Sequence, residues 1–173
     1  IDTIVLDKTG TVTTGRMTVA NVFVAAGTDE AEVLRVAALA EYGSEHPVAQ
    51  AIVSAAENRG MSPAGAESFA SAQGLGVQAV VDGRLVIVGR RSWLEQDWSV
   101  TVPPALGEAF TTAEARGETA VMVAWDGQAR GVISLGDTVK PTSADAVARF
   151  VALGLTPVLL TGDNAGSAAA MGA

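Results

Sequence analysis

The chain has 173 residues, of which 49% are hydrophobic, so it is long enough to bury a real core and too apolar to be disordered. Its formal net charge is −8, from 11 lysines and arginines against 19 aspartates and glutamates, which makes nucleic acid a poor candidate partner. It contains no cysteine, which excludes disulfides and thiolate metal sites and favours a reducing, cytosolic setting. Apolar stretches such as residues 19–26 are far shorter than the roughly 20 residues that span a bilayer, so no membrane crossing is predicted.

The first predicted element is a short strand, Thr3–Leu6, which ends at Asp7. Because it is short and apolar, we expect it in a parallel sheet that is buried on both faces. The chain starts inside this strand-like run and without methionine, which we interpret as a segment of a longer protein.

Two helices are predicted next. Asp29 is expected to cap the first, with Glu32 three residues later and an apolar face within residues 33–40. Pro47 suits the first turn of the second helix, because its missing N–H is not needed there, and that helix is expected to end near Asn58.

The middle of the chain predicts two β-hairpins, each with an Asp-Gly turn between apolar runs. The paired runs are Gly76–Val81 with Leu85–Val88, and Ala120–Trp125 with Ala129–Leu135. A helix is expected between the hairpins, from about Pro104 to Arg116. This region therefore predicts an antiparallel sheet flanked by helices.

The end of the chain returns to an α/β pattern. A helix is expected at Thr142–Leu153 and a strand at Thr156–Leu160, followed by a polar turn at residues 161–164 and a helix of small residues.

Two patterns in one chain indicate an α/β fold with an α+β insertion. We expect one module at residues 1–15 and 136–173, and the inserted antiparallel module at residues 16–135.

Polar loops follow both terminal strands, "DKTGT" after Leu6 and "TGDN" after Leu160. Ligands of parallel sheets bind beyond the carboxyl ends of the strands. If the two strands are neighbours, the loops bring together Asp7, Lys8, Thr9, Thr161 and Asp163. A carboxylate among hydroxyls and loop N–H groups could accept a phosphoryl group. Alternatively, the two aspartates merely cap their loops.

"DKTGT" resembles the phosphorylation motif of the P-type ATPases. "SEHPVAQAI" at residues 44–52 resembles a segment peculiar to the heavy-metal-transporting branch. Further segments follow in the order of that family, namely "GLGV" (74–77), "VGR" (88–90), "DTVKP" (137–141) and "TGDN" (161–164). The resemblance covers the whole chain. It implies a cytoplasmic loop in which a nucleotide-binding domain is inserted in an incomplete phosphorylation domain. The phosphorylation domain would have the haloacid dehalogenase-like, Rossmann-like fold.

For the terminal loops, the resemblance implies an aspartyl-phosphate enzyme that uses ATP and Mg²⁺. Asp7 would be phosphorylated and Thr9 would offer a carbonyl to Mg²⁺, which makes these two residues the metal site. The other implied catalytic residues are Lys8, Thr161, Gly162 and Asp163.

For the inserted module, the resemblance implies that Glu41 and His46 lie around the adenine and that Gly74, Gly76 and Gly89 approach the nucleotide. Glycine permits close approach, and an imidazole offers a flat face and a ring nitrogen to a purine. Out of context, His46 is a helix-start residue, the first two glycines form a turn, and Glu41 is the solvated end of its helix.

Other parts of the family pattern are absent or altered. The family often has asparagine where this chain has Arg90, which leaves that contact open. A later lysine and a Gly-Asp-Gly segment are expected beyond Ala173. The implied partners are ATP and the parent's transmembrane and actuator domains, on the cytoplasmic face of a membrane. The exported ion, bound elsewhere in the parent, would be a soft metal, with copper(I) favoured.

Two other functions stay open. One is a free haloacid dehalogenase-like phosphatase, but such enzymes usually carry a second aspartate two positions after the nucleophile, where this chain has Thr9. The other is a non-catalytic nucleotide-binding module.

Overall fold

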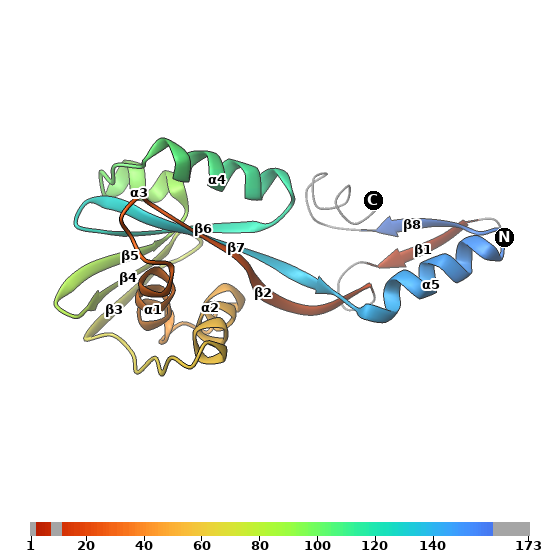
Figure 1. Ribbon diagram of the computed structural model, residues 1–173, viewed down its shortest axis with the longest axis horizontal. Coiled ribbons are helices and arrows are strands. Elements are labelled where there is room, and N and C mark those ends of the chain that lie inside the picture. The colour runs from red at the N-terminus through yellow and green to blue at the C-terminus, as the bar shows by residue number, and fades with distance from the viewer. Residues whose placement is uncertain (1–2, 8–11, 161–173) are drawn as a thin grey trace.

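The computed structural model describes residues 3–7 and 12–160 of the chain (Figure 1). The helices and strands, in chain order, are β1 (Thr3–Asp7), β2 (Thr13–Val24), α1 (Glu30–Glu41), α2 (Pro47–Asn58), β3 (Ser68–Ala72), β4 (Gly76–Val81), β5 (Arg84–Gly89), α3 (Arg91–Asp97), α4 (Pro104–Ala115), β6 (Thr119–Trp125), β7 (Gln128–Val139), α5 (Pro141–Ala152) and β8 (Thr156–Leu160). They form a 6-stranded sheet of order β2-β7-β6-β5-β4-β3 and a 2-stranded sheet of β1 and β8. The predicted α/β fold, with an antiparallel sheet flanked by helices, is confirmed.

The large sheet is covered on both faces, by α1 and α2 on one side and by α3 and α4 on the other (Figure 1). Successive side chains of β6 alternate between the two cores. Val121 and Val123 join the core of α1 and α2, whereas Met122 and Ala124 join the core of α3 and α4. Burial on both faces explains why β6 is a continuous apolar run.

Both predicted hairpins are confirmed by their turns. Asp82 and Gly83 have φ of 51° and 72°, and Asp126 and Gly127 have φ of 53° and 71°. Positive φ at both central residues defines the type I′ turn, whose twist matches that of the flanking strands. The Asp-Gly pairs therefore set the β4–β5 and β6–β7 registers.

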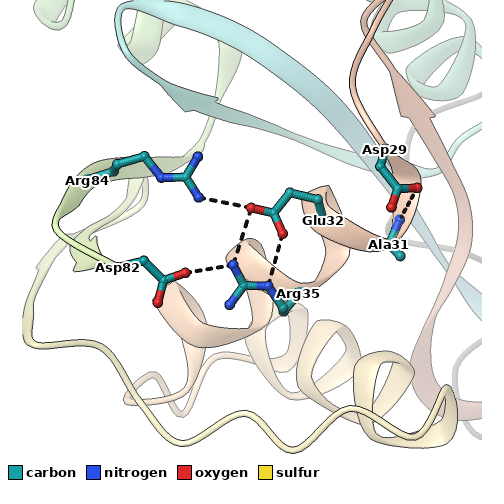
Figure 2. Close-up of polar contacts among 6 residues, drawn as sticks. All are labelled: Asp29, Ala31, Glu32, Arg35, Asp82 and Arg84. Atoms are coloured by element: carbon teal, nitrogen blue, oxygen red, sulfur yellow. Dashed lines mark hydrogen bonds and ion pairs between the residues drawn. The ribbon is translucent and has the colours of Figure 1, made fainter.

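The first predicted helix forms as α1 with Asp29 as its N-cap, as predicted, but Glu32 does not take part in the capping. The Asp29 carboxylate accepts a hydrogen bond from the N–H of Ala31 at 3.3 Å. Glu32 instead binds two arginines, Arg35 at 3.0 Å in the next turn of α1 and Arg84 at 2.9 Å on β5 (Figure 2). Two strong cationic partners thus draw Glu32 away from the helix start, and the helix is tied to the β4–β5 hairpin.

The long strands β2 and β7 form an antiparallel ribbon that runs from the large sheet to the small one (Figure 1). Strand β2 was not predicted, and the predicted module boundaries at residues 15/16 and 135/136 fall inside the ribbon. At its far end, Asp137 accepts hydrogen bonds from the hydroxyls of Thr13 and Thr14. The Ser143 hydroxyl of α5 donates to the carbonyl of Val12 at 2.7 Å.

Strands β1 and β8 are parallel neighbours, with Asp7 in register with Leu160. The predicted meeting of the two terminal loops required that these strands be neighbours, and they are. The expected burial of β1 on both faces is wrong. Val5 and Val158 are register partners and are 61% and 45% exposed. Helix α5 packs against β8, but no layer of the described chain covers the face that carries these two valines.

Candidate functional site

A cleft of about 1200 Å³ lies at the end of the large sheet, where β4 and β6 begin and β5 ends. Its walls come from the end of α1, the start of α2, the β3–β4 turn, the start of α3, and α4. The five residues predicted around the nucleotide all line it, namely Glu41, His46, Gly74, Gly76 and Gly89. The fold thus gathers these five residues into one cavity, whose full lining extends over residues 41–121.

Glu41 is the last residue of α1 and is only 5% exposed, so it is not a solvated helix end. Loss of hydration raises the pKa of this carboxyl to about 7, because burial penalises its charged form. No hydrogen bond or ion pair from the described residues reaches the carboxylate, although it lines the cleft. A buried carboxyl of this kind is available to a polar ligand.

His46 is the N-cap of α2, as the helix-start interpretation predicted. Its Nδ1 accepts a hydrogen bond from the N–H of Val48 at 3.2 Å. Because Nδ1 is an acceptor, the neutral ring carries its proton on Nε2. The imidazole is exposed and lines the cleft, so it presents a face and an Nε2–H donor while Nδ1 holds the helix start.

Two of the glycines are needed for the packing of the strands that end at the cleft. A Cβ on Gly76 would lie 2.3 Å from the Val88 carbonyl oxygen and 2.8 Å from the Trp93 ring. A Cβ on Gly89 would lie 2.4 Å from the Leu75 carbonyl oxygen. Only glycine therefore fits where β4 and β5 meet above the Trp93 indole.

Gly74 differs from these two, because its φ is +71° and a Cβ there would meet nothing within 4 Å. This glycine turns the chain from β3 into β4 and borders open space in the cleft. The turn interpretation of Gly74 is confirmed, and its backbone is accessible to a ligand.

The cleft also contains charged residues for which no role was predicted from the sequence. Arg91 pairs with Glu95 at 3.0 Å, and Glu114 and Glu118 add carboxylates from the side of α4 and β6. One carboxylate oxygen of Glu118 is buried without a hydrogen-bond partner among the described residues. No local pattern in the sequence marks these residues, because they lie on helices and loops that are distant in the sequence and meet only in the folded chain.

The predicted catalytic loops lie almost wholly outside the described residues. The backbone of Asp7 ends β1 beside Leu160. Lys8, Thr9, Thr161, Gly162 and Asp163 are outside the described ranges. Within residues 3–7 and 12–160, no group of three or more histidine or acidic side chains could hold a metal ion.

None of the described helices is both long enough and apolar enough to cross a membrane.

The family model for haloacid dehalogenase-like hydrolases matches residues 1–173. The chain belongs to this family. "Probable copper-exporting P-type ATPase V" of Mycobacterium tuberculosis (strain ATCC 25618 / H37Rv) is 47% identical over 171 residues, which are 99% of this chain and 22% of that protein. The "Copper-exporting P-type ATPase" of Bacillus subtilis (strain 168) is 38% identical, over 99% of this chain and 21% of that protein. This haloacid dehalogenase-like chain thus spans about a fifth of the length of these relatives, and the resemblance to P-type ATPases is confirmed.

Solved structures agree with the sequence relatives. A zinc-transporting PIB-type ATPase in the E2·Pi state matches with a TM-score of 0.87 at 35% identity, over 99% of this chain and 27% of that chain. A crystal structure of the N-domain of a copper-transporting P-type ATPase also matches. Its TM-score is 0.59 at 29% identity, over 70% of this chain and 99% of that chain.

Proposed function

We propose that this chain is the ATP-binding cytoplasmic loop of a heavy-metal-translocating P-type ATPase. The parent would hydrolyse ATP through an aspartyl-phosphate at Asp7 and export a soft metal ion, copper(I). The observation that carries the proposal is the cleft, because it contains all five residues for which the sequence predicts a nucleotide role. The names of the sequence relatives support copper as the exported ion.

Adenine recognition would depend on Glu41 and His46. An ionised Glu41 carboxylate accepts a hydrogen bond from the exocyclic amino group of adenine, whereas guanine presents a carbonyl oxygen at that place. The exposed imidazole of His46 can stack on the purine or donate from Nε2. The backbone at Gly74 can approach the nucleotide closely because no side chain stands in the way.

Phosphoryl transfer would take place at the edge where β1 and β8 end. A carboxylate oxygen of Asp7 forms a bond to the γ-phosphorus, the bond from that phosphorus to the β,γ-bridging oxygen breaks, and ADP leaves. Water then hydrolyses the acyl phosphate and restores the carboxylate. Thr161 and Gly162 would bind the phosphoryl oxygens, Asp163 would shape their loop, and Lys8 is a further catalytic residue that the resemblance implies.

Mg²⁺ would be held by Asp7 and the carbonyl of Thr9. The ion would neutralise charge on the transferred phosphoryl group.

We also propose the division into a split phosphorylation domain, residues 1–15 and 136–173, and a nucleotide-binding domain, residues 16–135. The match to a separately crystallised N-domain supports an insertion that folds as a unit. The transmembrane and actuator domains of the parent would be its partners.

Titration of the 15N-labelled chain with ATP, ADP and GTP tests the function. We expect weak ATP binding, in the high-micromolar to millimolar range, because few contacts must offset the ordering and desolvation costs. Amide shifts should be largest around Glu41, His46 and Gly74. Equal affinity for GTP, or no shift with millimolar ATP, contradicts the proposal.

A further inference from the structure

We infer that Arg90 is a phosphate-binding residue of the cleft, contacting the phosphates of the bound nucleotide rather than its base. This inference rests on the proposed function, because it assumes that the cleft holds ATP. It assigns a role to a position where the chain departs from the asparagine common in the P-type ATPases.

The backbone places Arg90 at the lip of the cleft. Its N–H donates to the carbonyl of Leu75 at 2.8 Å, which fixes it beside the turn that contains Gly74. It follows directly after Gly89, the register partner of Gly76. The position of Arg90 is therefore set by main-chain contacts, independently of its side chain.

The side chain of Arg90 has no structural task among the described residues. It is the N-cap of α3 but forms no capping hydrogen bond, and it is exposed. No carboxylate of the described chain pairs with it, whereas its neighbour Arg91 is held by Glu95 at 3.0 Å. The Arg90 guanidinium is thus available to a ligand in the adjacent cleft.

The charge of the cleft gives such a cation a task when a polyphosphate binds. Once the pair of Arg91 and Glu95 is set aside, the lining retains the carboxyl groups of Glu41, Glu114 and Glu118. Because the whole chain also carries a net charge of −8, the general field repels phosphate. Among the described lining residues, Arg90 is the one cation without an acidic partner.

The chemistry of the side chain fits this role. A guanidinium presents a planar set of N–H donors that can bind two phosphate oxygens at once, and it stays charged at all physiological pH values. An asparagine amide could donate a hydrogen bond but could not offset the charge of the phosphates. The open space beside Gly74 gives the phosphates room at the lip.

The experiment compares Arg90→Asn with the unmutated 173-residue chain, using adenosine, AMP, ADP and ATP as probes. Affinities are measured by amide shifts at pH 8 and constant ionic strength. We expect Arg90→Asn to weaken ATP and ADP binding about five- to tenfold, as for loss of a partly exposed charge-assisted contact. Adenosine binding should change by less than about twofold. Arg90→Lys should recover part of the ATP affinity, because it restores the charge without the planar fork.

Arg116→Asn is the matched control, since Arg116 is an exposed arginine at the C-cap of α4 that does not line the cleft. It removes the same charge and should leave all four affinities unchanged. An equal loss for adenosine and ATP in Arg90→Asn overturns the inference, and so does an unchanged ATP affinity. If the unmutated chain binds none of the four probes, it is the proposed function that fails.

Discussion

Gly76 and Gly89 face each other across β4 and β5 so closely that a Cβ on Gly76 would lie 2.6 Å from the Cα of Gly89. We expect Gly76→Ala to lower the free energy of unfolding by about 1 to 3 kcal/mol, because the added carbon forces the strands and the Trp93 ring apart. Urea unfolding measures the loss. Gly136→Ala is the control, since a Cβ there meets nothing within 4 Å, and equal stability of the two variants would contradict the prediction.

His46 has a structural and a proposed ligand-binding role that substitution can separate. We expect His46→Ser to keep α2 capped, because a serine hydroxyl accepts the same N–H of Val48. His46→Ala should lower the free energy of unfolding by about 0.5 to 1 kcal/mol through loss of the cap. Both variants should weaken ATP binding by about 1 to 2 kcal/mol, since both lack the ring.

His46→Gln, which also removes the ring, should weaken ATP binding by the same amount without unfolding the chain. Calorimetric melting and NMR titration of the three variants give the two quantities separately. Full ATP affinity in His46→Ser would restrict this residue to its capping role.

The sequence predicted well wherever local chemistry decides the structure. The type I′ turns follow from Asp82-Gly83 and Asp126-Gly127, whose backbone needs are strict. The sequence predicted the structure poorly where contacts between distant segments decide it. Strand β2 contains a glycine and irregularly spaced polar residues, and it forms because it pairs along most of its length with β7, a segment far away in the sequence. Strand β3 and the short helix α3 were missed for the same reason.

The five cleft residues that are proposed to bind a nucleotide were named from sequence motifs, but their physical state was not. The burial of Glu41 results from the packing of α1 against α2 and the sheet, so its raised pKa could be derived only from the fold. The strict need for Gly76 and Gly89 likewise depends on tertiary contacts, with the backbone of the facing segment and with the Trp93 ring.

Glu41 should make the stability of the chain depend on pH. Its pKa is about 7 in the folded chain, against an ordinary value of 4.5, because burial disfavours the charged form. Between these pH values the folded state binds more protons than the unfolded state at this site. The contribution of Glu41 to the free energy of unfolding therefore falls as the pH rises from about 4.5 to 7, and it stays low above that.

Glu41→Gln removes this titration and provides the measurement. The variant should be more stable than the unmutated chain at pH 8, by about 1 to 3 kcal/mol, and the difference should shrink toward pH 5. Urea unfolding at four pH values tests this, and a difference that does not change with pH contradicts it.

ATP binding to the unmutated chain should strengthen from pH 6 to 8, since the ionised carboxylate accepts from the adenine amino group.

Asp7 ends β1 in the 2-stranded sheet, whereas the cleft belongs to the 6-stranded sheet, so binding and chemistry should be separable by mutation. We expect Asp7→Asn to leave the ATP affinity of the 173-residue chain within about twofold, because the substitution lies outside the cleft. An amide nitrogen or oxygen does not replace the attacking carboxylate, so the same substitution in the full-length parent should abolish phosphorylation and transport together.

The unmutated 173-residue chain should itself remain unlabelled by γ-labelled ATP. The resemblance to P-type ATPases implies a further lysine and a Mg²⁺-binding aspartate in a Gly-Asp-Gly segment, which residues 1–173 do not contain, and loss of one such preorganised group commonly costs about a hundredfold to a thousandfold in rate. Incubation with γ-labelled ATP and Mg²⁺, acid quenching and hydroxylamine treatment detect an acyl phosphate. Hydroxylamine-sensitive label on the unmutated chain that is absent from Asp7→Asn would contradict this expectation and would show that residues 1–173 suffice for phosphoryl transfer.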